Sequence, residues 1–289
     1  MNFGKILDEP FTVYTATDCV GSHRLDDLTP YPIRYKLRYL DKKLPERPDT
    51  PDFRFGRFVH SLALEGDELT KARYIVIPEG APKWPTERQL IAKNPSAETK
   101  AAIKWWEEFK VLAAGREALS LDDWNLGFAM IEAVRANPSL AGLFKRGKPE
   151  VTFRHKMAYF GIQSRIDWLD EEDEAGVHIT DLKTISALEQ FDEHFRKYNY
   201  YRQAAFYRLV VARVLGLQTS QVQFSFAVVE KQEPYLSVRR DPDAESLAKG
   251  EEEVIRDLTL LKSCYQNNQW PGPVDSPVSL PLWVTRRAS

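Results

Sequence analysis

The sequence predicts an α/β (α+β) protein in which a central mixed β-sheet is flanked by helices. Alternating β-branched and aromatic residues between about 150 and 184 predict three antiparallel strands. Stretches with apolar residues at helical spacing come before and after this run. Strand character returns near 222–240, so strands and helices are expected to share one sheet-based core.

The elements follow from the local pattern along the chain. Residues 1–52 are rich in proline and charge, and we expect them to be irregular apart from one helix near 32–40. In chain order, the remaining pattern predicts a helix over 55–69, a short strand near 73–78, a loop over 81–95, helices over 96–117 and 121–136, strands over 150–156, 160–169 and 177–184, a helical stretch over 187–215 broken near Tyr198, strands near 222–231 and 235–240, and an acidic helix over 243–266.

Length and composition fit a single domain. The expected parts are an extension over 1–52, a core over 53–240 with a helical insertion at about 80–140, and a C-terminal helix and tail over 241–289. The chain has two cysteines, Cys19 and Cys264, which argues against a disulfide framework, an iron–sulfur cluster or a cysteine-rich zinc site.

The absence of targeting and membrane-spanning patterns, and the net charge, limit the classes of protein that we expect. We see no signal-peptide pattern and no apolar run of the roughly 20 residues that span a bilayer, so a cytoplasmic protein without membrane contact is expected. The net charge of −2 excludes a globally basic nucleic-acid binder, although basic stretches alternate with acidic ones along the chain.

The stretch Ile179–Thr184, "ITDLKT", places two charges on an otherwise apolar strand. Residues two apart share one face, so Asp181 and Lys183 project together. A hairpin turn centred near Glu174 sets Asp167 opposite Asp181. Two carboxylates this close repel unless a cation lies between them, and oxygen ligands suit Mg²⁺ or Mn²⁺. Lys183 could then steady a phosphate or orient an attacking water.

The other interpretation of this motif is a surface ion pair beside an exposed aspartate, which is common for an arbitrary D-x-K. The context favours a metal site, because the motif ends a strand, has an aspartate in register and precedes a helix. On that helix Tyr200, Gln203 and Tyr207 share one face, where they could hold phosphate oxygens or simply pack.

Two further residues are ambiguous on their own. His60 lies among apolar helix residues, where a packed core histidine is the commoner outcome. Glu150 begins the first of the three strands and could be a solvated strand end, or the strand meander could bring it near Asp167.

Five segments in this order resemble a known pattern: "FGRFVHSLALEG", "GKPEVTF", "SRIDW", "ITDLKT" and "YYRQAAFY". They are similar to the PD-(D/E)xK nuclease superfamily, and within it to the exodeoxyribonuclease VIII (RecE-type) exonucleases, which are related to the RecB nuclease domain and lambda exonuclease. The resemblance covers about 55–215. It implies a restriction-endonuclease-like core with the element order αβββαβ, and Mg²⁺- or Mn²⁺-dependent hydrolysis of DNA.

The resemblance also implies roles for individual residues. It assigns metal ligation to His60, Asp167, Asp181 and the backbone carbonyl of Leu182, and catalytic roles to Glu150, Asp167, Asp181, Lys183, Gln203 and Tyr207. Relatives often have a lysine where this chain has Gln163. Sequence-independent contacts to the DNA backbone are expected from basic residues, of which the candidates are Arg54, Arg57, Lys145, Arg146, Arg165, Arg196 and Arg202.

The biological setting comes from the resemblance alone. It implies digestion of double-stranded DNA from the 5′ end in phage- or prophage-type recombination, a ring-shaped homo-oligomer and a single-strand-annealing recombinase as partner. Two alternatives stay open: a structure-specific endonuclease on the same core, and a DNA-binding or assembly module without catalysis. A small-molecule enzyme has little support, because the sequence has neither a Gly-rich phosphate loop nor a nucleophile elbow.

Overall fold

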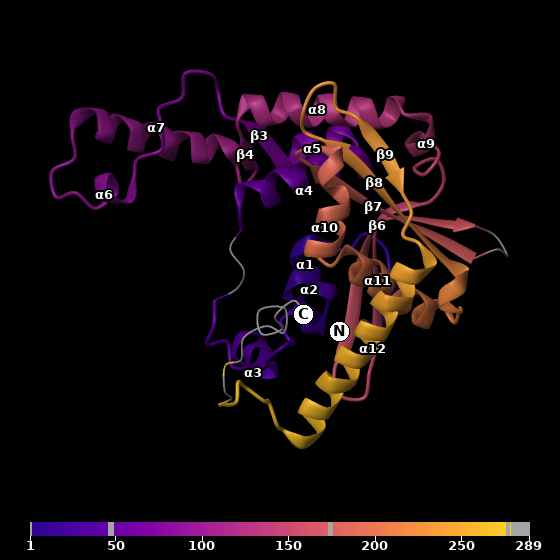
Figure 1. Cartoon of the computed structure of the whole chain (residues 1–289). Coiled ribbons are helices and arrows are strands. Elements are labelled where there is room, and N and C mark those ends of the chain that lie inside the picture. The colour runs from indigo at the N-terminus through magenta and orange to yellow at the C-terminus, as the bar shows by residue number, and fades with distance from the viewer. Residues whose placement is uncertain (1, 46–48, 173–175, 276–277, 279–289) are drawn as a thin grey trace, which may run out of the picture.

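The computed structural model describes residues 2–45, 49–172, 176–275 and 278 (Figure 1). The strands are β1 (Gly4–Ile6), β2 (Cys19–Val20), β3 (Tyr74–Val76), β4 (Glu117–Leu119), β5 (Lys148–Lys156), β6 (Gly161–Glu172), β7 (Gly176–Ile185), β8 (Val222–Glu230) and β9 (Ser237–Arg240). The α-helices are α1 (Phe11–Ala16), α2 (Ser22–Asp26), α3 (Pro32–Tyr35), α4 (Pro51–Leu64), α5 (Asp67–Arg73), α6 (Glu87–Leu90), α7 (Ala97–Ala113), α8 (Leu121–Ala136), α9 (Pro138–Ala141), α10 (Phe191–Lys197), α11 (Tyr200–Leu215) and α12 (Ala244–Asn267).

A seven-stranded mixed sheet forms the centre, in the order β1-β5-β6-β7-β8-β9, with β2 beside the start of β6. The β5–β6 and β6–β7 pairs are antiparallel hairpins. The β7–β8 pair is parallel, because α10 and α11 carry the chain back across the sheet before β8 begins. The predicted fold class, a mixed sheet flanked by helices with the order αβββαβ, is confirmed.

The β6–β7 ladder has the predicted register but ends early. Its paired residues run from Glu172 opposite Gly176 to Trp168 opposite Thr180, while the turn centred on Glu174 lies outside the described residues. Beyond Thr180, β7 continues to pair with β8 on its other side. The two strands therefore part where Asp167 and Asp181 would be the next pair, which opens a fork in the sheet.

Helices cover both faces of the sheet, and each face has its own apolar core. On one face α4 and α8 pack over β7 and β8, with Phe58 and Leu182 among the fully buried residues. On the other face α11 packs over β5, β6 and β8, with Phe206 and Phe226 buried, and α12 packs on α11 (Figure 1). Because successive side chains of β7 and β8 point to opposite faces of the sheet, these two strands contribute residues to both cores.

Short elements depart from the prediction. Residues 1–52 were expected to be irregular outside one helix, and this was wrong: β1 pairs with β5, β2 pairs with β6, and α1 and α2 lie between and after them. The helix expected over 96–117 ends at Ala113, and β4 follows it; α6 forms within the expected loop. Strands of two or three residues are too short to carry a periodic signal.

The predicted helical insertion divides into two parts. The α6–α7 portion projects away from the body of the molecule, whereas α8 returns to pack on α4 (Figure 1). Strand β3, which precedes the insertion, pairs in parallel with β4 inside it to form a separate two-stranded sheet. Part of the insertion therefore belongs to the core that carries the fork.

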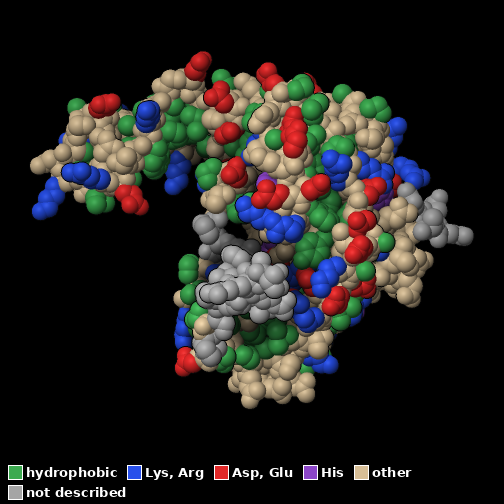
Figure 2. All heavy atoms as spheres, in the orientation of Figure 1, with side chains coloured by type: hydrophobic (Ala, Val, Ile, Leu, Met, Phe, Trp, Pro, Cys, Tyr) green, Lys and Arg blue, Asp and Glu red, His purple; other side chains and the backbone are tan. Residues whose placement is uncertain are grey.

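Charges of both signs are intermixed on the face shown in Figure 2, in keeping with the net charge of −2. Within the described part of the chain, no helix combines the length and the apolar character needed to cross a membrane.

The close contact between α11 and α12 leads to a stability prediction at Gly250. A Cβ at this position would lie 2.6 Å from the backbone oxygen of Tyr201 and 3.0 Å from Ala205 Cβ. Gly250→Ala is therefore expected to lower the free energy of unfolding by about 1–3 kcal/mol in urea titrations, because overpacking outweighs the better helix propensity of alanine.

Gly56, inside α4, is the matched control, because a Cβ there meets nothing within 4 Å. Gly56→Ala should raise the free energy of unfolding by roughly 0.5–1 kcal/mol. Equal stabilisation by both substitutions would show that the two helices are not in close contact at Gly250.

Candidate active site

The fork between β6 and β7 brings the two predicted aspartates together. Asp167 Oδ2 accepts a hydrogen bond of 2.8 Å from the backbone N–H of Leu182, directly after Asp181. The side chains of Asp167 and Asp181 are 14% and 3% exposed. Because the N–H and C=O of one strand residue point to the same side, the carbonyl of Leu182 is directed into the same gap.

Glu150 continues this row on the third strand. In the β5–β6 ladder Pro149 pairs with Trp168 and Val151 with Ile166, so the same register sets Glu150 across from Asp167. Glu150 itself has no partner in the β5–β6 ladder and has a φ of 54°, a left-handed conformation that is strained for a glutamate. Three carboxylates, one from each of three neighbouring strands, thus lie side by side.

His60 reaches the row from α4 on the neighbouring layer. The helix starts at Thr50, whose side chain accepts from the N–H of Phe53, and its apolar face buries Phe58 and Leu62. This orientation leaves His60 Nδ1 3.4 Å from Asp167 Oδ2. Burial lowers the pKa of His60, but the charge and hydrogen bond of Asp167, with the charges of Glu150 and Asp181, together outweigh burial and raise the pKa to about 9.

Lys183 and Gln203 complete the other side of the site. Lys183 Nζ lies 2.6 Å from Asp181 Oδ2 and donates a hydrogen bond of 3.0 Å to Gln203 Oε1. Gln203 Nε2 in turn donates to Tyr207 Oη at 3.0 Å and to Asp181 Oδ1 at 3.4 Å. The Lys183 ammonium also lies over the ring of Tyr200, 4.7 Å from its centroid.

Electrostatics keep Lys183 charged in this arrangement. Burial lowers its pKa, but Asp181, Tyr200 and Asp167 together raise the pKa above its usual 10.5. Burial raises the pKa of Asp181, against the pull of Lys183, and Asp167 adds to the rise. Burial acts to raise the pKa of Asp167 as well, yet His60, Lys183 and the backbone N–H of Leu182 together lower the pKa overall. Lys183 is thus suited to stabilise negative charge rather than to accept a proton.

The donor set fits a hard divalent cation. His60, Glu150 and Asp167 each offer a ligand atom, and these atoms lie within 4.8 Å of one another. Asp181 stands outside this group of three, whereas the expected set was His60, Asp167 and Asp181. Its Oδ2 atom is buried and accepts no directed hydrogen bond, although the Lys183 ammonium lies beside it. One imidazole with carboxylate oxygens suits Mg²⁺ or Mn²⁺.

Two of the arginines expected to contact DNA lie on the first turns of α4. Arg54 has an exposed side chain, with Nη1 4.0 Å from a carboxylate oxygen of Asp49. The guanidinium of Arg57 is already bound by protein carboxylates, because it donates two hydrogen bonds to Asp49 and a third, of 3.1 Å, to Glu117. Arg54 therefore has the guanidinium that is more open to a phosphate.

Two more of the expected contacts, Arg165 and Arg202, are occupied by protein groups. Arg165 is ion-paired with Glu150 and donates a hydrogen bond of 2.7 Å to the backbone oxygen of Glu9, so it orients a site carboxylate. Arg202 is buried among three carboxylates, which are Asp26, Glu253 and Asp257. The position of Arg202 does not support the expected DNA contact, because its charge is neutralised inside the protein.

Gln163, where relatives often have a lysine, belongs to a buried network. Its side chain accepts a hydrogen bond of 2.9 Å from Arg154 Nε and donates one of 3.2 Å to the backbone oxygen of Tyr14. Arg154 also holds Glu9 through two hydrogen bonds of 2.7 and 2.8 Å. Gln163 therefore anchors the N-terminal segment to β5 and β6 and is not a candidate phosphate contact.

Tyr14 is a neighbour of the site that was not predicted, because no motif or periodic pattern in the sequence marks it. It lies on α1, where the Arg165 guanidinium is 6.0 Å from the centroid of its ring. Burial, together with Tyr14 and Asp181, raises the pKa of Tyr207 well above 10, so Tyr207 remains a neutral hydroxyl. The N-terminal segment thus forms one wall of the site.

Comparison with known proteins identifies the family. Residues 35–276 match the family described as a PDDEXK-like domain of unknown function. The chain belongs to this PDDEXK-like family. The resemblance to the PD-(D/E)xK nuclease superfamily is thereby confirmed.

One solved structure supports the same fold. A Eubacterium rectale protein that is provisionally named as an exonuclease is similar with a TM-score of 0.55 and 11% identity, over 95% of this chain and 96% of that chain. At this identity the likeness shows the fold alone. The structure of SSO0001 has a TM-score of 0.27 and 11% identity over 74% of this chain and 88% of that chain. This similarity is too low to indicate a shared fold. No curated protein matches the sequence.

The raised pKa of His60 leads to a prediction about metal binding by this PDDEXK-like domain. A pKa of about 9 means that His60 carries a proton at pH 7, and that proton must leave before the nitrogen can bind a metal. Metal affinity is therefore expected to rise with pH until about 9. Calorimetric titration with Mn²⁺ in buffers of different ionisation enthalpy measures the protons released.

The control is His60→Gln, which keeps a polar side chain but has no proton to lose. We expect the wild-type protein to release about one proton more per metal at pH 7 than this variant. Because the pKa values of Glu150 and Asp181 are also raised by burial, only the difference between the two proteins reports on His60. Equal proton release would remove His60 from the ligand set.

Proposed function

We propose that this chain is a metal-dependent deoxyribonuclease that removes nucleotides from the ends of double-stranded DNA. The observation that carries the proposal is the row of Glu150, Asp167 and Asp181 at the fork, with a charged lysine beside it. Three carboxylates at this spacing are costly to keep ionised without a cation. A site that keeps three carboxylates together despite their mutual repulsion is suited to bind a metal and a phosphate together.

The side chains of the site have three separate roles, which are metal binding, charge stabilisation and positioning. His60, Glu150 and Asp167 would hold Mg²⁺ or Mn²⁺, with Asp181 as the adjacent ligand. When bound, the ion would polarise the phosphate and lower the pKa of a coordinated water. Lys183 supplies the positive charge that the pentavalent state requires. Gln203 holds Lys183 and Asp181 in place through hydrogen bonds to both.

Recognition is expected to depend on the DNA backbone and not on base sequence. The site presents charges that match a phosphate, and Arg54 on α4 provides an exposed guanidinium. The mixed charge of the face in Figure 2 favours a local contact near the site over a broad basic surface. Binding should therefore have a modest dependence on salt concentration.

Digestion of end-labelled linear duplex and of covalently closed circular duplex, with and without Mg²⁺, tests the proposal. We expect the wild-type protein to degrade the linear DNA alone, and only when Mg²⁺ is present. Lys183→Ala should lose cleavage by about 10²–10³-fold, the typical cost of removing one charge-stabilising group.

Each outcome has a definite meaning. Cleavage of the closed circle would identify an endonuclease on the same core and overturn the exonuclease proposal. Absence of cleavage with retained DNA binding would identify a DNA-binding module. Equal activity of Lys183→Ala and wild type would overturn the role given to Lys183.

The wider setting follows from the resemblance and is part of the proposal. We propose 5′-to-3′ digestion in phage- or prophage-type recombination, with a single-strand-annealing recombinase as partner and a ring-shaped homo-oligomer as the working form. Strand polarity can be read in the same assay by labelling the 5′ or the 3′ end.

A further inference from the structure

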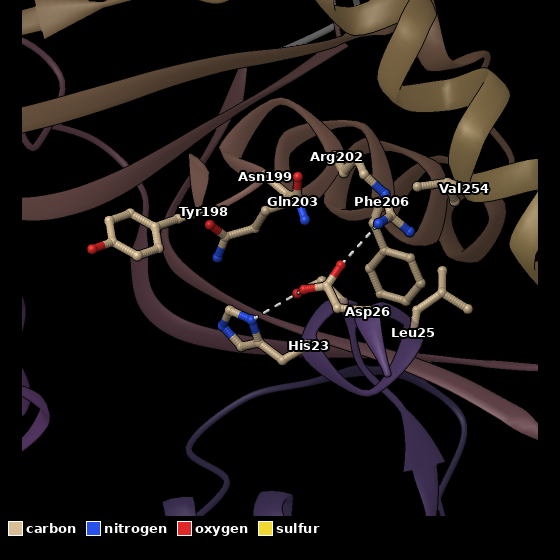
Figure 3. A pocket seen from close by; sticks show the side chains of 10 residues that line it. His23, Leu25, Asp26, Tyr198, Asn199, Arg202, Gln203, Phe206 and Val254 are labelled. Atoms are coloured by element: carbon tan, nitrogen blue, oxygen red, sulfur yellow. Dashed lines mark ion pairs between the residues drawn. The ribbon is translucent and has the colours of Figure 1, made fainter. Parts of the chain in front are cut away.

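An exposed aromatic residue marks the junction between α10 and α11. Tyr198 is the C-cap residue directly after α10 and has 47% of its surface exposed, although it is a large hydrophobic residue. Asn199, which follows, has a φ of 57° and turns the chain sharply before α11 begins at Tyr200. In Figure 3 the Tyr198 ring extends away from the side chains of Asp26 and Arg202 and leaves its hydroxyl at the outer edge.

A row of rings connects Tyr198 to the catalytic lysine. The ring centroids of Tyr198 and Tyr200 are 5.9 Å apart with the planes inclined by 35°. Tyr200 is the ring over which the Lys183 ammonium lies, at 4.7 Å, and its centroid is 5.8 Å from that of Phe226 in the sheet. The exposed ring is therefore continuous with the site described above.

The surroundings of Tyr198 are cationic and polar. Lys197 Nζ lies 5.4 Å from the centroid of the Tyr198 ring, and the His194 ring is nearly perpendicular to it with the two centroids 4.8 Å apart. Arg196, on the same last turn of α10, is exposed. A small pocket between α2 and the junction is lined by Tyr198 and by Gln203 of the site, so the same surface leads inward to the catalytic side chains (Figure 3).

We propose that the exposed face of Tyr198 is a stacking platform for an unpaired nucleobase, next to the phosphate that is cleaved. The proposal rests on the proposed nuclease function and adds the form of DNA that the site accepts. A flat aromatic face beside cations matches a base with its flanking phosphate, because every base has a π-face and every phosphate a negative charge. A protein partner would bury a wider apolar surface than one ring between charged neighbours.

This platform has a consequence for the substrate. A base within a duplex is stacked and paired, so its face cannot lie on Tyr198 until it leaves the helix. The strand that enters the site is therefore single-stranded at the point of cleavage. DNA ends that fray easily, or that carry a few unpaired nucleotides, should be bound more tightly than blunt G·C-rich ends.

The test compares Tyr198→Ala and Tyr198→Phe with Tyr159→Ala. Phenylalanine keeps the ring and removes the hydroxyl. Tyr159 is the matched control, because it is also 47% exposed but lies in the turn between β5 and β6, about 20 Å along β6 from Asp167. Two quantities are measured with Mg²⁺ on a duplex with a short single-stranded end: KM with kcat, and the fluorescence change of a 2-aminopurine placed in that end.

We expect Tyr198→Ala to raise KM by roughly 5- to 150-fold with kcat nearly unchanged, as for loss of one base stack, and to abolish the fluorescence change. Tyr198→Phe and Tyr159→Ala should behave as the wild type. Wild-type values for Tyr198→Ala, or a defect shared by Tyr198→Phe, would overturn the platform while leaving the nuclease proposal intact. A wild-type protein that neither binds nor cleaves the DNA would overturn both proposals.

Discussion

Asp181→Asn is expected to lower the rate of DNA hydrolysis by at least roughly 10³-fold in single-turnover assays with saturating Mg²⁺. The substitution keeps the shape of the side chain but removes the charge that faces the metal site and holds Lys183 at 2.6 Å. Several kcal/mol of stabilisation of the transition state depend on that charge, and each 1.36 kcal/mol is a factor of ten in rate.

Asp170→Asn is the matched control on the neighbouring strand. Asp170 lies on β6, within the paired part of the ladder, and its carboxylate is 3.7 Å from Arg146. Its replacement should leave the rate within about twofold, because a partly exposed ion pair contributes little. Wild-type activity of Asp181→Asn, with an unchanged circular dichroism spectrum, would contradict the role given to Asp181.

Asp257→Ala is expected to lower the free energy of unfolding by about 3–5 kcal/mol, measured by guanidinium titration. Asp257 is fully buried on α12 and accepts a hydrogen bond of 2.5 Å from Arg202 Nη2 on α11. Its loss leaves the buried guanidinium of Arg202 with weaker partners, since Asp26 and Glu253 lie at 3.1 and 3.5 Å. Because α11 carries Gln203 and Tyr207, activity should fall together with stability.

Glu252→Ala provides the comparison on the same helix. Glu252 pairs with Lys249 at 3.0 Å, but its side chain is 69% exposed. An exposed pair of this kind contributes less than about 1 kcal/mol. A loss of stability for Asp257→Ala as small as that for Glu252→Ala would show that the Arg202 cluster does not hold α11 against α12.

The grouping of Asp167, Asp181 and Lys183 was predictable because it depends on local rules, whereas the parting of β6 and β7 between the two aspartates was not predicted. The period of two along a strand places Asp181 beside Lys183, and the hairpin register places Asp167 opposite Asp181. The position of one turn was therefore enough to predict that these three side chains lie together. The spacing of Gln203 and Tyr207 on a helix follows in the same way. The structure brings all five side chains to one place, together with Tyr200.

The remaining parts of the site needed tertiary information. His60 reaches Asp167 from a helix on another layer, and its own sequence context is that of a core residue. Glu150 joins the row through a left-handed backbone that a glutamate rarely adopts, which no periodic pattern indicates. The burial of Arg202 by carboxylates from α2 and α12 depends on contacts far apart in the chain.

The very short strands are another part of the structure that local sequence patterns do not predict. β1 and β2 have three and two residues, so their place in the sheet is set by the partners β5 and β6 and not by their own sequence. The buried Glu9–Arg154 pair then fixes the segment between them against the sheet. This is how an extension expected to be irregular came to form a wall of the site.

The most direct test of the metal site at the fork is a crystal structure grown with Mn²⁺, with anomalous scattering recorded near the manganese edge. We predict an anomalous peak in coordination contact with His60, Asp167 and at least one of Glu150 and Asp181. A fully ordered fork without a peak, at Mn²⁺ concentrations that saturate calorimetric binding, or a peak elsewhere alone, would contradict the account.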